Sequence, residues 1–303
     1  MARNMARARA TPAAGLGSQL RNYVQLMRLD KPIGIWLLLW PTLWALWLAG
    51  KGRPDGALFA VFVLGVIVMR SAGCVLNDFA DRKIDPHVAR TRARPLATGA
   101  VAPTEALTLF VALSLIAVGF AAMLNRPAQL LAIVAAALTI VYPFIKRFLS
   151  IPQLVLGAAF GWAVPMAFAA QTGGTEQLAW LVFGVALTWA VIYDTFYAMA
   201  DREDDRRIGV KSTAILFGDA DLFVIGGLQV LMLLALVLVG HMAALGGWYY
   251  GSLVVVAVLM GYHQWLARGR DPAACFKAFL HNHYIGMTVF AGIVLDYTFR
   301  PVL

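Results

Sequence analysis

Apolar residues in this chain gather into long runs that are separated by shorter polar segments. A bilayer core is crossed by about 20 consecutive apolar residues of helix, and runs of about this length recur along the chain. The strict alternation of apolar and polar residues found in membrane barrels is absent. The pattern predicts an all-α, polytopic membrane protein with nine transmembrane helices, at residues 32–50, 57–76, 104–124, 128–146, 151–170, 178–200, 221–240, 248–266 and 283–299.

Composition agrees with this architecture. Hydrophobic residues make up 61% of the 303 residues and charged residues only 14%, so the charges are confined to the segments between apolar runs. Residues 1–22 are rich in arginine and alanine and contain no apolar core of a signal peptide, so we expect a basic, disordered cytoplasmic tail. Residues 23–303 then form a single intramembrane domain.

The positive charges indicate which loops face the cytoplasm. Of the 25 lysine and arginine residues, all but Lys51, Arg53, Arg126 and Arg300 fall in segments at one side of the predicted membrane. Because basic loops are retained in the cytoplasm, this side is predicted to be cytoplasmic, with the N-terminus there. The net charge of +9 follows this topology, which argues against a nucleic-acid partner.

A first group of acidic residues follows the second apolar run. If the helix continues through it, Asn77, Asp81 and Asp85 recur every four residues and present their oxygens on one face. Hard oxygen ligands of this kind suit Mg²⁺, which usually keeps water and shares its coordination with substrate phosphates.

A second group closes the sixth apolar run, between Asp194 and Asp205. Asp194, Asp201 and Asp205 are spaced to share one helical face. Each group taken alone fits a solvated acidic loop as well as it fits a binding site. Two such groups at the same predicted membrane face favour two halves of one Mg²⁺–diphosphate site.

Several basic and phenolic residues are candidates for binding the substrate. Tyr142 and Lys146 are four residues apart and share a helical face, although Lys146 is equally typical of an interfacial anchor. Arg90, Arg92 and Arg94 follow the first acidic group and fit either a diphosphate or ordinary positive-inside charge. Arg70 lies inside an apolar run, where an unpaired charge costs about 2.5–3.5 kcal/mol, so we expect it to face the interior and to bind a substrate anion or an aspartate.

Two motifs resemble the signatures of the UbiA superfamily of intramembrane aromatic prenyltransferases. They are N-D-x-x-D-x-x-x-D at residues 77–85 and Y-D-x-x-Y-A-x-x-D-x-x-x-D at residues 193–205. Beyond the motifs, the chain looks most like the branch that prenylates 4-hydroxybenzoate, in residues 28–34, 39–45, 94–96, 142–147, 157–162 and 208–218. The resemblance covers nearly the whole chain after about residue 20.

This resemblance implies nine helices around a central cavity that opens sideways to lipid. It implies Mg²⁺-dependent transfer of a polyprenyl group from polyprenyl diphosphate to the ring carbon ortho to the hydroxyl of 4-hydroxybenzoate, with release of diphosphate. The reaction would belong to ubiquinone biosynthesis in the inner membrane of a bacterium. Membrane lipid would be the other partner.

The resemblance also implies roles for individual residues. Asn77, Asp81 and Asp85 would bind one Mg²⁺, and Asp201 and Asp205 another. Asp78 and Asp194 would support these ligands or activate the acceptor, with Tyr197 as a further catalytic candidate. Tyr142 and Lys146 would bind the diphosphate.

Alternatives remain open at this level. The acidic motifs do not separate 4-hydroxybenzoate prenylation from the menaquinone and haem O reactions of the same superfamily. A CDP-alcohol phosphotransferase would have one compact acidic run, whereas this chain has two. Outside enzymes, a secondary transporter with an internal repeat would place acidic residues near mid-membrane, whereas these gather at one face.

Overall fold

The computed structural model describes residues 15–88, 90–145, 148–149 and 151–299, and these form helices and loops without a strand. Within these ranges, eight helical segments are long and apolar enough to cross a membrane, and α2 is a shorter apolar helix. The predicted all-α, multi-pass membrane fold is therefore confirmed. The helices are α1 (Leu16–Leu26), α2 (Ile33–Ala49), α3 (Gly56–Asp81), η1 (Asp85–His87), α4 (Pro103–Ala122), α5 (Arg126–Ile145), α6 (Pro152–Gly161), α7 (Ala163–Thr172), α8 (Gln177–Ile208), α9 (Thr213–Phe217), η2 (Gly218–Ala220), α10 (Asp221–Met242), α11 (Gly247–Ala267), α12 (Pro272–His281) and α13 (His283–Phe299).

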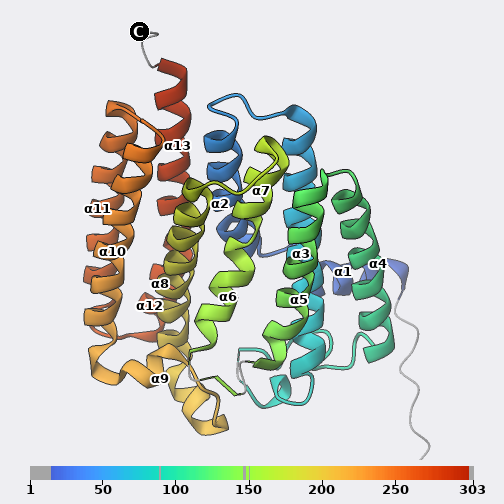
Figure 1. Cartoon of the computed structure of the whole chain (residues 1–303). Coiled ribbons are helices and arrows are strands. Elements are labelled where there is room, and N and C mark those ends of the chain that lie inside the picture. Colours follow the sequence, from blue (N-terminus) through green and yellow to red (C-terminus); the bar gives the residue numbers. More distant parts are fainter. Residues whose placement is uncertain (1–14, 89, 146–147, 150, 300–303) are drawn as a thin grey trace, which may run out of the picture.

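The bundle is organised around α2, α6, α7 and α8. In Figure 1, α10, α11 and α13 lie on one side of this group and α3, α4 and α5 on the other. Large aromatic side chains fill the centre, where the rings of Trp44 and Trp189 lie 5.5 Å apart. Trp44 also donates a hydrogen bond of 2.9 Å to the carbonyl oxygen of Gly286, which joins α2 to α13.

The two helices that carry the acidic motifs, α3 and α8, both run toward the same end of the bundle. Helix α3 begins after Asp55, whose side chain accepts a hydrogen bond from the backbone N–H of Leu58, and ends at Asp81. Helix α8 ends before Gly209, whose φ of 71° is the left-handed conformation that glycine adopts without strain. Both acidic ends lie at the lower edge of Figure 1, as expected from the sequence.

One predicted helix is interrupted in the structure, and another is preceded by a helix that the sequence did not predict. The predicted helix at 151–170 is divided into α6 and α7 at Trp162, three residues before Pro165, whose ring excludes the carbonyl of the preceding turn. The helix predicted at 283–299 is α13, and an unpredicted helix, α12, precedes it. The two are separated at Asn282, whose side chain donates to the carbonyl oxygen of Ala278 and accepts from the Trp189 indole.

Close helix packing explains a pair of glycines in α6. A Cβ atom on Gly157 would lie 2.9 Å from the carbonyl oxygen of Leu187, and one on Gly161 would lie 3.1 Å from the Phe183 ring. Only glycine lets α6 approach α8 so closely. The spacing of these two glycines predicts this contact, and the structure confirms it.

Helix α1 begins at Leu16, within the range that the sequence assigns to the basic tail. Its inward side packs through Leu26 and Tyr23 against Val75 of α3 and Ala106 of α4. Residues 1–14 lie outside the described residues. The folded domain therefore includes at least residues 16–22 of the segment expected to be tail.

Candidate active site

A cavity of about 1490 Å³ is lined mainly by helices α2 to α8, and Phe276 and Phe279 of α12 also reach it. Both acidic groups line it: Asn77, Asp78, Asp81 and Asp85 on one side, and Asp194, Asp201 and Asp205 on the other. These side chains come from segments more than 100 residues apart in the chain, so only the fold brings them together. The predicted meeting of the two acidic groups is therefore observed in the geometry.

The first acidic group is not a continuous helical face. Helix α3 ends at Asp81, and Asp85 is the first residue of η1, so the expected continuation of the helix to Asp85 is wrong. The turn nevertheless returns Asp85 to the cavity, where Thr91 donates a hydrogen bond of 2.9 Å to its carbonyl oxygen. Asp85 is thus positioned by the loop after α3 and not by α3 itself.

The second acidic group follows the helical prediction. Asp194, Tyr197, Asp201 and Asp205 all lie on α8 and all line the cavity, at spacings of three, four and four residues. The ring of Tyr197 packs at 4.8 Å against the ring of Phe279 from α12. This contact closes the cavity on the side of α12.

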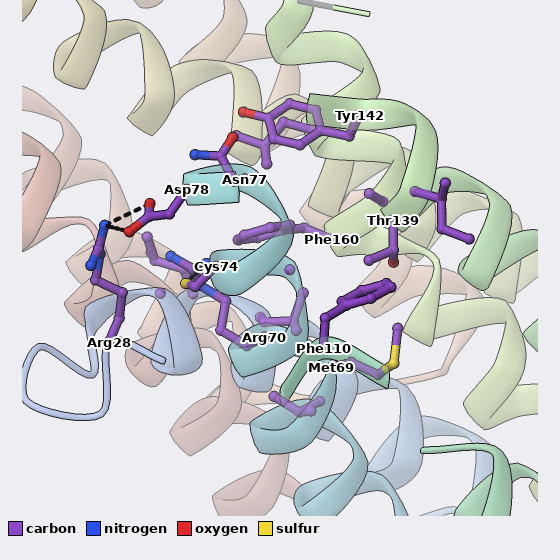
Figure 2. A pocket seen from close by; sticks show the side chains of 18 of the residues that line it. Arg28, Met69, Arg70, Cys74, Asn77, Asp78, Phe110, Thr139, Tyr142 and Phe160 are labelled. Carbon is purple, nitrogen blue, oxygen red and sulfur yellow. Dashed lines mark hydrogen bonds and ion pairs between the residues drawn. The ribbon is translucent and has the colours of Figure 1, made fainter. Parts of the chain in front are cut away.

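Asp78 joins the first group to two arginines. The guanidinium of Arg28 donates to both carboxylate oxygens of Asp78 at 2.9 Å, and Arg94 donates to Asp78 at 3.0 Å. Arg28 has a left-handed backbone (φ 57°) in the turn between α1 and α2. Asp78 is buried and its oxygens accept from these two cations, so its carboxylate holds both guanidinium groups at the wall of the cavity. Figure 2 shows the pair of Arg28 and Asp78.

Arg94 also reaches Asp85, with an N–O distance of 3.0 Å. Burial raises the pKa of the Asp85 carboxyl, and the nearby charges of Asp78 and Asp81 add to the effect, although Arg94 opposes it. Burial would lower the pKa of Arg94, but the carboxylates of Asp78 and Asp85 outweigh it and raise that pKa above its usual value. Negative charge is therefore crowded at this end of the cavity, which favours a further cation.

Arg90 connects the first group to the second. It forms an ion pair with Asp201, and its guanidinium lies 4.1 Å from the centre of the Tyr197 ring. The loop after α3 therefore closes over the end of α8 through one side chain. An anion of higher charge than one carboxylate would compete with Asp201 for this guanidinium.

Arg70 lies on α3 at a distance from the acidic end of that helix. It is seven residues before Asn77 on α3, about two helical turns, and it lines the cavity. Its guanidinium hydrogen-bonds Cys74 and lies 5.7 Å from the centre of the Phe160 ring (Figure 2). A Cβ atom at position 34 would overlap this guanidinium, so Gly34 of α2 provides the room that Arg70 occupies.

Comparison with known proteins shows which family has both this fold and these two acidic motifs. The UbiA prenyltransferase family matches residues 38–286 of the chain. The chain belongs to this family. It is 57% identical to the 4-hydroxybenzoate octaprenyltransferase of Nitrosococcus oceani, over 91% of this chain and 96% of that protein. It is 52% identical to the protein of the same name from Pseudomonas aeruginosa, over 95% and 98% of the two chains.

Solved structures of UbiA homologues have the same fold. A homologue from Aeropyrum pernix, solved in its apo form, superposes with a TM-score of 0.77 at 26% identity, over 86% of this chain and 97% of that chain. A homologue from Archaeoglobus fulgidus bound to GPP and Mg²⁺ superposes with a TM-score of 0.66 at 19% identity, over 90% and 99% of the two chains.

Within this UbiA-family cavity, the predicted site residues fall into three sets. Those that line the cavity are Arg70, Asn77, Asp78, Asp81, Asp85, Arg94, Tyr142, Asp194, Tyr197, Asp201 and Asp205. Arg92 does not line it and is exposed to solvent. Lys146 lies outside the described residues, so its predicted contact with diphosphate stays a prediction.

Three further basic residues line the cavity, and for two of them, Arg28 and Arg90, the sequence fits a binding role and membrane topology equally well. Arg28 and Arg90 line the cavity and bind aspartates of the two acidic groups, and Lys211 lines it from the segment after α8. Arg28 and Asp78 are 50 residues apart, so no spacing rule could pair them. The sequence signal from Arg28, Arg90 and Lys211 is weak, because each is a basic residue that fits membrane topology equally well.

The carboxylate oxygens of the two acidic groups are suited to a divalent cation that is also coordinated by oxygens of a bound ligand. Among the described residues, no three histidine, cysteine, aspartate or glutamate side chains lie close enough to hold a metal by themselves. Each acidic group offers few carboxylates around a polar, open space, which fits Mg²⁺ with water and phosphate oxygens completing the shell. A closed structural metal site is therefore not what these residues form.

Proposed function

We propose that this protein transfers a polyprenyl group from polyprenyl diphosphate to the ring carbon ortho to the hydroxyl of 4-hydroxybenzoate and releases diphosphate. The observation that carries the proposal is one cavity, which joins two acidic groups and three arginines at one end to an apolar wall among the apolar helices. A diphosphate head and a long apolar tail fit these two environments. The names of relatives that are 52–57% identical supply the acceptor, and the reaction would serve ubiquinone biosynthesis.

We assign the divalent metal to the two acidic groups. Asn77, Asp81 and Asp85 would hold one Mg²⁺, and Asp201 and Asp205 another, as the motifs imply. The A. fulgidus homologue was solved with GPP and Mg²⁺, which supports a metal-bound diphosphate in this family. When bound, Mg²⁺ would neutralise charge on the departing diphosphate.

The arginines at the polar end would bind the diphosphate oxygens. Arg28 and Arg94 are held in place by Asp78, and Arg90 by Asp201. Cations positioned before the reaction stabilise negative charge on a leaving group without further reorganisation. The bond between the allylic carbon and oxygen breaks, both electrons leave with the diphosphate, and the cavity wall excludes water from the resulting allylic cation.

The acceptor would lie deeper, between Arg70 and Asp194. Each is seven residues, about two turns, closer to the membrane centre than a metal-binding residue of its own helix, Asn77 and Asp201 respectively. Both residues line the same cavity, as does Tyr193. We assign the acceptor carboxylate to Arg70 and activation of the phenol to Asp194. The ring π electrons form the new C–C bond, and the ring carbon then loses its proton to the released diphosphate.

The location follows from the charge distribution. The protein is a multi-pass membrane protein, and we place it in the bacterial inner membrane with the acidic end and the N-terminus in the cytoplasm. Basic residues concentrate at that end, as the positive-inside rule requires. Charged substrates would then reach the polar end from the cytoplasm and the prenyl tail would approach through lipid.

An assay on membranes that contain the protein tests the proposed function. Radiolabelled 4-hydroxybenzoate, polyprenyl diphosphate and Mg²⁺ are supplied with and without EDTA, and label is measured in the lipid extract. We expect lipid-extractable label that EDTA abolishes. Membranes without the protein are the control. Absence of product would refute this acceptor assignment, and the naphthoate and protohaem acceptors of the same superfamily would be assayed in its place.

A further inference from the structure

The loop between η1 and α4 places one arginine on each acidic group. Arg94 of this loop forms an ion pair with Asp85 of the first group, and Arg90 forms one with Asp201 of the second. In the proposed function, Asp85 and Asp201 belong to different Mg²⁺ sites. A single loop therefore supplies each proposed metal site with a guanidinium group that occupies one of its carboxylates.

The two arginines are held with different strength. Arg94 donates to Asp78 at 3.0 Å and to Asp85 at 3.0 and 3.2 Å, and its side chain is 19% exposed. Among the described residues, Arg90 forms an ion pair with Asp201 alone, and its side chain is 36% exposed. Two buried carboxylates fix Arg94 in place, whereas a single pair that is partly open to water contributes little stability. Arg90 is thus the guanidinium group that can change its partner.

The ring of Tyr197 keeps Arg90 beside the cavity. Its centre lies 4.1 Å from the guanidinium carbon of Arg90, within the range of a cation–π contact. Tyr197 is one turn before Asp201 on α8, and Arg90, Tyr197 and Asp201 all line the cavity. Because the ring contact does not involve the carboxylate, it holds the guanidinium group at the cavity wall even when Asp201 binds another cation.

The guanidinium group and a metal ion compete for the same carboxylate. Oδ2 of Asp201 accepts from Arg90, and a divalent cation at this carboxylate would lie close to the guanidinium charge and be repelled by it. A divalent cation that arrives alone must therefore displace Arg90. A diphosphate removes this conflict, since it offers Arg90 an acceptor of higher charge than one carboxylate.

We propose that Arg90 is an exchangeable counter-cation of the second acidic group. It binds Asp201 before the substrate enters and transfers to the diphosphate when that anion binds, which leaves Asp201 to the divalent cation. Diphosphate and divalent cation then strengthen each other's binding at this group, because a coupling between two ligands is reciprocal. The inference rests on the proposed function and adds the exchange of ionic partners that precedes the reaction.

Two arginines of the loop provide a matched test. Arg92 is exposed and does not line the cavity, so Arg92→Gln controls for the loss of one positive charge. In phosphatidylcholine nanodiscs, Mn²⁺ binding without substrate is measured by electron paramagnetic resonance, and geranyl diphosphate binding in EDTA is measured by calorimetry. We expect Arg90→Gln to bind Mn²⁺ about threefold more tightly than the parent protein and geranyl diphosphate about tenfold more weakly. Both affinities of Arg92→Gln should stay within about twofold of the parent values.

Asp201→Asn separates exchange from general electrostatic attraction. This variant releases Arg90 from its carboxylate, so it should bind geranyl diphosphate in EDTA about fivefold more tightly than the parent protein. In the Arg90→Gln background, the same substitution removes a negative charge but releases no guanidinium group, and its effect should stay within about twofold. The double-mutant cycle thus measures the coupling between Arg90 and Asp201.

Other outcomes would overturn the exchange. Equal effects of Asp201→Asn in the two backgrounds, or an Mn²⁺ affinity that Arg90→Gln leaves unchanged, would show that Arg90 does not exchange between Asp201 and the diphosphate. If Arg90→Gln does not yield a monodisperse protein, Arg90→Ala and Arg92→Ala are compared in the same way. If geranyl diphosphate binds to none of the proteins, the proposed function fails at its substrate, and the Mn²⁺ measurement still decides whether Arg90 competes with the metal.

Discussion

Asp81 and Asp201 represent the two acidic groups at the level of single residues. Asp81 is the last residue of α3, whereas Asp201 lies two turns before the end of α8. Both line the cavity, and each is assigned to a different Mg²⁺. Replacing either by alanine should lower kcat about 10²- to 10³-fold, the usual effect of removing one group that stabilises developing charge. The variants are assayed with prenyl diphosphate over a range of Mg²⁺ concentrations.

Asp204 provides the control for these two variants. It lies on α8 between Asp201 and Asp205, does not line the cavity, and forms a partly exposed ion pair with Arg207. Asp204→Ala should keep the kcat of the parent protein. Near-normal turnover of Asp81→Ala or Asp201→Ala would show that the reaction does not need both acidic groups.

Arg70 is assigned to the acceptor carboxylate and can be tested through substrate specificity. A hydrogen bond to a charged group contributes about 1.5–3 kcal/mol, so Arg70→Ala should raise the KM for 4-hydroxybenzoate about 10- to 100-fold. The KM for the prenyl diphosphate should hardly change, because Arg28, Arg90 and Arg94 bind that substrate. Arg70→Lys should restore part of the affinity.

An acceptor without the carboxylate sharpens this test. Phenol lacks the group that Arg70 is proposed to bind, so parent protein and Arg70→Ala should prenylate phenol at similar, low efficiency. If Arg70→Ala loses efficiency with phenol as strongly as with 4-hydroxybenzoate, Arg70 serves the structure of the cavity and not the carboxylate.

At the level of elements, the end of α8 is held in place from the side away from the cavity. Arg202 of α8 and Arg270 of the α11–α12 loop both form ion pairs with Asp221, the first residue of α10, which is fully buried. Arg270 adopts a left-handed backbone (φ 53°) and also donates a hydrogen bond of 2.7 Å to the carbonyl oxygen of Asp219. Three elements thus meet at one carboxylate.

Asp221→Ala should therefore destabilise the protein. Without the Asp221 carboxylate, the guanidinium groups of Arg202 and Arg270 would have no ion-pair partner there. Breaking a buried ion pair in this way lowers the free energy of unfolding by about 3 kcal/mol, at the lower end of the usual range because Arg270 is partly exposed to water. We expect a lower Tm in detergent, measured by tryptophan fluorescence. Asp219→Ala is the matched control, since the exposed side chain of Asp219 makes no such pair. Equal Tm values for the two variants would contradict this role of Asp221.

The sequence predicted the transmembrane elements well because the bilayer imposes long apolar runs on them. It did not predict α12, whose ten residues are too few to cross a membrane and include Lys277 and His281. It also extended α3 to Asp85, because the residues after Asp81 contain neither proline nor glycine before Pro86. What ends that helix is tertiary: Arg94 and Thr91 hold Asp85 in the turn.

The sequence predicts those site residues whose positions follow from the spacing of residues along one helix. Asp194, Asp201 and Asp205 share a face of α8, and their joint presence in the cavity follows from periodicity. The ion pairs of Arg28 with Asp78 and of Arg90 with Asp201 cross between distant segments, so periodicity says nothing about them. These pairs depend on loop conformation, which long-range contacts determine.

The orientation of the whole molecule is the last prediction. Lys51 is exposed in the connection between α2 and α3, at the end of the bundle opposite the acidic groups, and Arg206 is 53% exposed at the acidic end (Figure 1). Because basic loops are retained in the cytoplasm, the end that carries most of the basic residues should face inward. That orientation also places the proposed diphosphate and metal sites at the cytoplasmic face.

Single cysteines at these two positions report the orientation. The native Cys74 and Cys275 are buried, so the background labelling should be low. In intact spheroplasts, a maleimide that does not cross membranes should label Lys51→Cys and leave Arg206→Cys unlabelled, and permeabilised spheroplasts should show label at both. The reverse pattern would place the acidic groups on the outer side. The arginines and aspartates of the cavity would then face a compartment without the proposed prenyl diphosphate, and the proposed reaction would lose its substrate supply.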